Sequence, residues 1–133
     1  MNELEPHKLD TQSFSFRDLI GQDKWTPWTP VFGSLTVVGA TSYSGRWRVV
    51  GRQCFFEVAF SAATSIASTA GTDYLNLPLT ANAGGLAGAG QMTNSTTKVG
   101  VGVCHLDVAG SRCYLPTQLA SANVFNLAGW YEV

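Results

Sequence analysis

Short stretches in which apolar and polar residues alternate run from about residue 30 to the C-terminus. Alternation with a period of two is typical of β-strands that bury one face. Glycine, proline and small polar residues separate the stretches, and we expect strands at residues 32–40, 43–50, 53–60, 73–78, 98–106, 111–115 and 124–133. Seven or eight strands without a helical period predict an all-β domain, an antiparallel β-sandwich of jelly-roll type, over residues 25–133.

The clearest local structure is a hairpin over residues 43–60. Gly51 and Arg52 fit a two-residue type II′ turn, with the glycine first. The pairs that this turn predicts are Val50 with Gln53, Val49 with Cys54, Arg48 with Phe55, Trp47 with Phe56 and Arg46 with Glu57. One face of the hairpin is then apolar, and on the other face Arg46 meets a carboxylate and Arg48 meets a ring. Both arginines therefore have a structural role, and we do not interpret them as a binding patch.

A second hairpin is expected around residues 107–110, a type I turn that begins with aspartate and ends with glycine. With Gly110 as a left-handed bulge residue, Asp107 pairs with Ser111. Cys104 and Cys113 then lie on opposite sides of the sheet. The chain has three cysteines at irregular spacing, which is neither a disulfide framework nor a zinc pattern, so we expect three reduced, buried thiols.

Residue faces can be assigned in two further strands. The apolar face of residues 98–106 is expected to consist of Val99, Val101 and Val103. Glycines on the opposite face indicate close approach by another backbone or ring. In the last strand, Trp130 falls on the face opposite Phe125, Leu127 and Tyr131. Two segments rich in small residues, 61–72 and 80–97, are expected to be loops, and the second is long for a compact domain.

Residues 1–24 differ from the rest of the chain, and we expect them to form an N-terminal arm. They hold more than half of the nine acidic residues and a weak capping box at residues 15–18. The arm's apolar side chains, too many for a plain disordered tail, are Phe14, Phe16, Leu19 and Ile20. The arm packs on its own domain or docks on a neighbouring subunit or larger assembly, and the sequence leaves both open. Trp25 and Trp28 lie in the proline-containing boundary segment and are further candidate partner contacts.

Charged residues are sparse and balanced. They make up 13% of the 133 residues, with a net charge of −1. This gives no electrostatic reason to expect nucleic acid or an anionic membrane as a partner. A surface of small polar residues suits a protein that hides much of itself in an oligomer or particle, and it suits many β-sandwiches too. The chain has no apolar stretch of about 18 residues and its acidic N-terminus lacks the apolar core of a secretory signal, so we expect synthesis in a cytoplasm.

Groups that could support catalysis are few. His105 and Asp107 share a strand face, but no serine lies in a nucleophile elbow, and a structural histidine is the favoured interpretation. The four carboxylates after residue 24 form no evident pair for glycosidase chemistry. Histidine and cysteine spacing fits no metal site, and the glycine-rich segment at 84–90 lacks the lysine of a P-loop. We therefore expect no catalytic, metal or cofactor site, and Trp130 is the candidate ligand or subunit contact.

Four segments carry a resemblance to a known family. They are a tryptophan-rich segment at 25–30, the hairpin residues 45–58, a Leu-Asn-Leu-Pro strand end at 75–78 and a terminal Leu-Ala-Gly-Trp-Tyr-Glu-Val strand at 127–133. Together they resemble the C-terminal knob domains of bacteriophage tail-fibre and related virion proteins, over residues 25–133. The resemblance implies a β-sandwich homotrimer that is exposed on a virion, contacts a host surface or a capsid through its loops and has no catalytic motif.

A short arm before the knob, without a shaft or coiled coil, favours a small stand-alone virion component such as a head decoration or short spike protein. We therefore expect a non-enzymatic homotrimer that other virion proteins hold through residues 1–24. The alternative is a carbohydrate-binding module or receptor-binding adhesin that uses Trp130 or the 80–97 segment to bind a host-surface glycan. An enzyme is disfavoured, because the chain lacks paired acids and an activated nucleophile.

Overall fold

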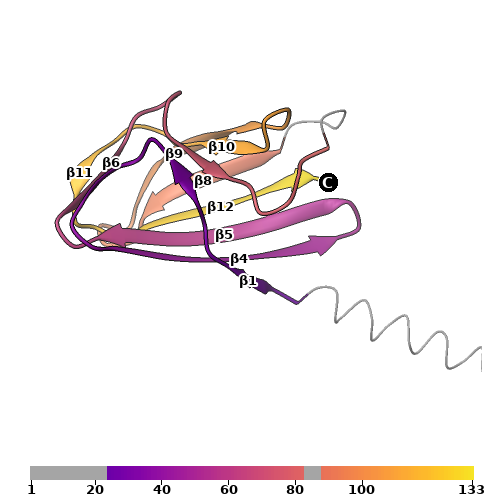
Figure 1. The fold of residues 1–133 in the computed structure, drawn as a ribbon, viewed down its shortest axis with the longest axis horizontal. Helices are drawn as coiled ribbons and strands as arrows, with labels where there is room; N and C mark the ends of the chain where they lie inside the picture. The colour runs from indigo at the N-terminus through magenta and orange to yellow at the C-terminus, as the bar shows by residue number, and fades with distance from the viewer. Residues whose placement is uncertain (1–23, 83–87) are drawn as a thin grey trace, which may run out of the picture.

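A computed structural model of the chain describes residues 24–82 and 88–133, and all regular structure in them is β (Figure 1). This confirms the prediction of an all-β, antiparallel, sandwich-like domain. The strands of the described residues are β1 (Thr26–Trp28), β2 (Phe32–Gly33), β3 (Thr36–Val38), β4 (Thr41–Val50), β5 (Gln53–Ala62), β6 (Ser65–Ser68), β7 (Tyr74–Asn76), β8 (Ala89–Asn94), β9 (Val99–Asp107), β10 (Arg112–Tyr114), β11 (Gln118–Ser121) and β12 (Phe125–Glu132).

The strands form one large curled sheet and one small sheet. The large sheet has the order β1-β4-β5-β12-β8-β9-β10-β7-β2, and the small sheet has the order β11-β6-β3. The large sheet curls over the core, because Phe32 of edge strand β2 packs against Tyr43 and Phe60 near the other edge, with ring centroids 5.5 and 4.8 Å apart. Figure 1 shows β4, β5 and β12 on one side of the core and β9 and β10 on the other. One face of the curled sheet is therefore inside and the other is outside.

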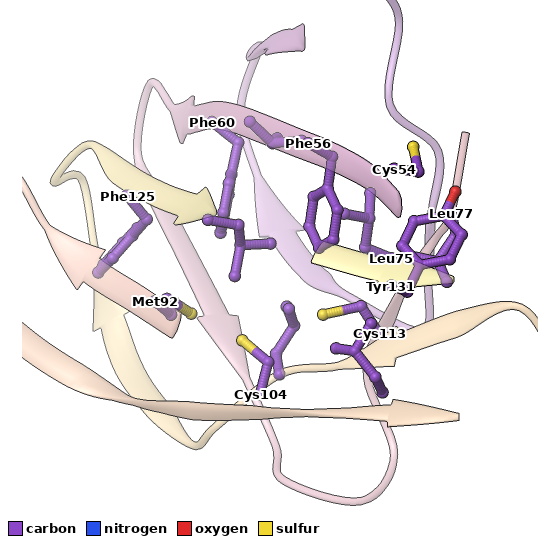
Figure 2. Packing of buried hydrophobic residues seen from close by; sticks show 14 of the residues in the cluster. Cys54, Phe56, Phe60, Leu75, Leu77, Met92, Cys104, Cys113, Phe125 and Tyr131 are labelled. Carbon is purple, nitrogen blue, oxygen red and sulfur yellow. The ribbon is translucent and has the colours of Figure 1, made fainter. Parts of the chain in front are cut away.

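Strict alternation in β5 and β12 defines the inner face. The buried residues of these strands are Cys54, Phe56, Val58, Phe60, Ala62, Phe125, Leu127 and Tyr131. Phe60 packs on Phe125 at 5.7 Å between ring centroids, and Phe56 packs on Tyr131 at 6.0 Å. Figure 2 shows these side chains in the interior, with Met92 near Phe125. The intervening residues face outward, and Trp130 is among them, as predicted.

The register predicted for the first hairpin is confirmed at every pair from Arg46–Glu57 to Val50–Gln53. Gly51 adopts a φ of 63°, as the first residue of a type II′ turn requires. Arg46 Nη2 lies 2.7 Å from Glu57 Oε1. The Arg48 guanidinium lies 5.6 Å from the centre of the Phe55 ring. Turn chemistry and residue alternation were sufficient here, because both act within one short segment.

The register predicted for the second hairpin is wrong by one residue. Asp107 pairs with Arg112 instead of Ser111, and the left-handed residue is Ser111, with a φ of 52°, instead of Gly110. Ser111 is held there by a distant segment: its Oγ accepts a hydrogen bond from the Ala81 amide and its carbonyl accepts one from Leu77. In consequence Cys104 and Cys113 both point into the core and do not lie on opposite sides of the sheet (Figure 2).

The expectation that Val99, Val101 and Val103 share one apolar face is also wrong. The pairing of β8 with β9 shifts by one residue, which makes Val101 the extra residue of a β-bulge. Val101 packs against the core, whereas 81% of Val103 is exposed. The close approach expected at the glycines is found at Gly102, where a Cβ would touch Pro116, and not at Gly100.

Both segments that were expected to be loops contain a strand. β6 lies within residues 61–72 and β8 lies within residues 80–97. Their small residues form strands because partners flank them on both sides, β11 and β3 for β6, and β12 and β9 for β8. The strand expected at residues 32–40, with an interruption at Gly33, is divided into β2 and β3, which join different sheets. Ser34, with a φ of 65°, makes the break.

Candidate functional site

One row of side chains crosses the outer face of the large sheet, and most of its members carry a ring or a guanidinium. Consecutive members are paired across neighbouring strands, with one exception. Ala89 and His105 lie one position beyond the last pair of β8 and β9, Gly90 with Cys104. The members, in strand order from β4 to β2, are Arg48, Phe55, Trp130, Ala89, His105, Tyr114, Tyr74 and Gly33. We call this set the outer row.

Trp25 extends the outer row at the β1 edge of the sheet. Thr26 pairs with Trp47, so Trp25 lies across from Arg48. The Trp25 ring contacts two guanidinium groups, with centroid distances of 4.5 Å to Arg46 and 4.9 Å to Arg48. Cation–π contacts of this kind stabilise by about 0.5–1 kcal/mol each at exposed positions. Trp25 is therefore fixed on the outer face and is not part of the core.

The two arginines beside Trp25 differ in their polar partners. Arg46 donates two hydrogen bonds to Glu57 Oε1, from Nε at 2.9 Å and from Nη2 at 2.7 Å. Both side chains are about half exposed, so the pair adds at most about 1 kcal/mol to stability. Within the described residues, Arg48 has neither a hydrogen bond nor an ion pair, and its Nε is buried without a partner. Arg48 is thus a cation held by rings alone.

A shallow hollow of about 520 Å³ lies along this part of the outer row. Residues that line it include Trp25, Arg48, Phe55, Gln91, Val103 and Trp130. The small side chains of Ala89 and Ala128 leave its floor low between the rings. We call it the tryptophan hollow. Rings, a guanidinium and an amide around one depression can bind a ligand that has both flat apolar faces and polar groups.

The other half of the outer row is a packed cluster of rings. Tyr74 and Tyr114 meet edge to face at 5.6 Å, and His105 lies 6.3 Å from Tyr114. The Arg112 guanidinium lies over Tyr74 at 4.3 Å, and its contact with the Tyr114 hydroxyl raises the pKa of Arg112 further above its ordinary value. Tyr74 covers Gly33, where a Cβ would overlap the ring. These rings pack on one another, and His105 and Tyr114 also line a second hollow of about 480 Å³.

His105 and Asp107 are not joined into a catalytic pair in the described residues. Asp107 Oδ1 accepts a hydrogen bond from the Gly110 amide at 3.3 Å, and His105 stacks near Tyr114. In residues 24–82 and 88–133 no group of three histidine, cysteine, aspartate or glutamate side chains is placed to hold a metal ion. No helix in the same residues is long and apolar enough to cross a membrane.

The three thiols are free and buried. Burial raises the pKa of Cys54, and the neighbouring Tyr131 hydroxyl partly opposes that rise. The hydrogen bond with Cys104, together with burial, raises the pKa of Cys113 far above its ordinary value. Thiols of this kind are poor nucleophiles, because the reactive species is the thiolate.

Three strongly exposed apolar side chains lie on β9 and β11. Val103 and Leu119 are each 81% exposed, and Val99 is 60% exposed. Val103 pairs with the exposed Gln91 and lies on the outer face, whereas Val99 pairs with the buried Asn94 and lies on the opposite face of β9. Thr117 lines one shallow hollow with Val103 and another with Val99 and Leu119. We call Val99, Val103 and Leu119 the apolar shoulder. The shoulder adjoins the tryptophan hollow, since Val103 belongs to the shoulder and also lines the hollow.

The candidate residues predicted from sequence fall into three groups. Trp25 and Trp130 lie on the outer face, and 36% of Trp130 is exposed. Trp28 instead packs against the core, with its ring over Gly45. The arm residues Phe14, Phe16, Leu19 and Ile20 lie outside the described residues. Sequence reasoning missed Val103 and the unpaired state of Arg48, because both depend on neighbours that only the sheet order reveals.

The chain was compared with models of known protein families, with curated proteins and with solved structures, and none of them matches. The fold and the outer face therefore define the class of this protein by themselves. It is an all-β, sandwich-like domain with an aromatic outer row and an exposed apolar shoulder.

Proposed function

We propose that this protein is a non-enzymatic structural protein of a phage particle, that it acts as a homotrimer, and that residues 1–24 anchor it to other virion proteins. The fibre-knob resemblance of residues 25–133 supports the virion setting and the trimer. The observation that carries the self-association is the apolar shoulder. Its function then lies in contacts between surfaces and not in a reaction.

The apolar shoulder is unusual for a free surface. Single exposed apolar residues are common, but valine and leucine side chains that are 81% exposed and border the same residue, Thr117, favour an interaction site. Full burial of a valine or leucine contributes about 1.5–3 kcal/mol as an upper bound, so three such side chains can supply several kcal/mol. The chain's low charge also favours burial, because charged groups are depleted at the centres of interfaces.

The test is the molar mass of the full chain and of two variants, measured by light scattering after size-exclusion chromatography. The Val103→Lys/Leu119→Lys double variant should lower the mass to that of the monomer, because it would bury two charges in the interface. Val38→Lys is the matched control, since Val38 is 50% exposed on β3, and it should keep the wild-type mass. A double variant that assembles like the wild type contradicts a contact through the shoulder.

A second function, attachment to a host-surface glycan, is favoured by the outer row. Its rings and planar polar groups provide what sugar binding needs, flat apolar faces with donors and acceptors beside them. The Trp25 end of the hollow lies away from the apolar shoulder, and Val103 borders the hollow at its other end, beside Gln91.

A further inference from the structure

Arg48 is an available cation in the tryptophan hollow. A guanidinium has five N–H donors and ordinarily finds acceptors for several of them. Trp25 and Phe55 hold this guanidinium between them, at 4.9 and 5.6 Å, while no acceptor in the described residues reaches it. The rings thus fix its position, and within residues 24–82 and 88–133 its donors have no acceptor.

The positive and negative side chains around the hollow do not balance. Glu57 also lines the hollow, but its carboxylate is engaged by Arg46 through two hydrogen bonds. Among the described residues, Arg46, Arg48 and Glu57 together leave one positive charge without a counterion. An occupant that carries one carboxylate would complete this site, because guanidinium and carboxylate form paired, charge-assisted hydrogen bonds.

The remaining lining of the hollow fits a sugar ring. Trp130, 36% exposed, presents an aromatic surface on which the apolar face of a sugar can stack. Gln91 is exposed beside it and can donate to hydroxyl groups and accept from them. Ala89 and Ala128 keep the floor low enough for a flat ring to lie across it. We propose that the tryptophan hollow binds a saccharide that carries a carboxylate group.

A second copy of the described domain is poorly suited to fill the same site. Among the described residues, Glu57 is engaged by Arg46, and Asp73 is buried and accepts a hydrogen bond from the Thr69 amide. Asp107 caps the turn at Gly110, so Glu132 is the one side-chain carboxylate of the described residues that a second copy could offer. An acidic sugar supplies the missing charge together with hydroxyl groups, so it matches the hollow better.

The experiment titrates the full chain with two matched pairs of probes in isothermal calorimetry. The pairs are galacturonate oligosaccharides against galactose oligosaccharides, and sialyllactose against lactose. At least one acidic probe should bind about tenfold more tightly than its neutral partner, because a hydrogen bond to a charged group contributes more than one between neutral groups. This comparison needs no variant, so it stands even where a substitution disturbs folding.

Three variants then locate the site. Arg48→Gln should abolish the preference for the acidic probe, and Trp130→Ala should lower the affinity for both the acidic and the neutral probe. Arg52→Gln is the matched control, because Arg52 is exposed in the hairpin turn and does not line the hollow, and it should bind like the wild type. Thermal unfolding of each variant shows that it is folded.

Several results would overturn the proposal. They are equal binding of acidic and neutral probes, an acidic preference that survives in Arg48→Gln, and no binding of any probe. Dissociation of an oligomer by Trp130→Ala would also overturn it, since the hollow would then be a subunit contact. The molar mass of the wild type is measured independently of sugar binding. Failure of sugar binding can therefore be distinguished from failure of the trimer proposal.

Discussion

The Tyr131 hydroxyl holds the backbone of Leu79 against the core, and this contact can be tested directly. The ring of Tyr131 is fully buried, and its hydroxyl donates to the Leu79 carbonyl at 2.8 Å and accepts from the Leu79 amide at 3.0 Å. Burial, reinforced by the neighbouring Cys54 thiol, raises the pKa of Tyr131, so the hydroxyl keeps its proton at all ordinary pH values. Tyr131→Phe removes both hydrogen bonds and leaves the packing of the ring unchanged.

Two neutral hydrogen bonds contribute about 0.5–1.5 kcal/mol each, so Tyr131→Phe should lower the free energy of unfolding by about 1–3 kcal/mol. Urea unfolding followed by circular dichroism measures this loss, and the denaturant dependence should not change. Tyr43→Phe is the matched control. Its ring packs on Phe32, and no hydrogen bond holds its hydroxyl in the described residues, so its effect should stay within about 0.5 kcal/mol.

The reasoning would be refuted by equal stability of Tyr131→Phe and Tyr43→Phe. It would also be refuted by a loss of stability in Tyr43→Phe larger than that in Tyr131→Phe. Either result would mean that the Tyr131 hydroxyl does not hold Leu79 as the structure shows.

The remaining predictions concern the sheet, the thiols and the arm. Gly129→Ala should lower the free energy of unfolding in urea by about 1–3 kcal/mol, because the new Cβ would lie 2.5 Å from the Ala89 carbonyl oxygen. Gly100→Ala is the control and should be nearly neutral, because the space around Gly100 is open. Equal effects of the two variants would contradict the packing. Thiol titration should find three free thiols in denatured, non-reduced protein and slow reaction in the folded protein, and one free thiol would disprove the assignment. Because the folded-state pKa values of Cys54 and Cys113 are raised, the unfolded state loses thiol protons first, and stability should fall as pH rises above the ordinary thiol pKa. Deletion of residues 1–24 should leave a folded domain and abolish incorporation into the particle, and a truncated protein that still incorporates would rule out the anchor.

Local rules predicted the parts of this fold that local interactions determine. The Gly51 turn and the alternation around it were enough to assign all pairs of the first hairpin. The second hairpin could not be assigned in this way, because Ser111 is held by Ala81 and Leu77, about 30 residues earlier in the chain. A contact of that kind outweighs the preference of glycine for the left-handed region.

The candidate site was predicted only in part, for a similar reason. The outward direction of Trp130 follows from alternation in the last strand. Its position beside Phe55 depends on the pairing of β12 with β5, and the exposure of Val103 depends on the bulge in β9. Sheet order and bulges arise from the whole chain, so the outer row and the apolar shoulder become visible only in the folded protein.

The molar mass of the wild-type full chain in solution tests the central claim of self-association most directly. Light scattering over a series of protein concentrations should give about three times the 14.2 kDa mass of one chain. A mass of one chain at every concentration would contradict both the trimer and the role of the apolar shoulder.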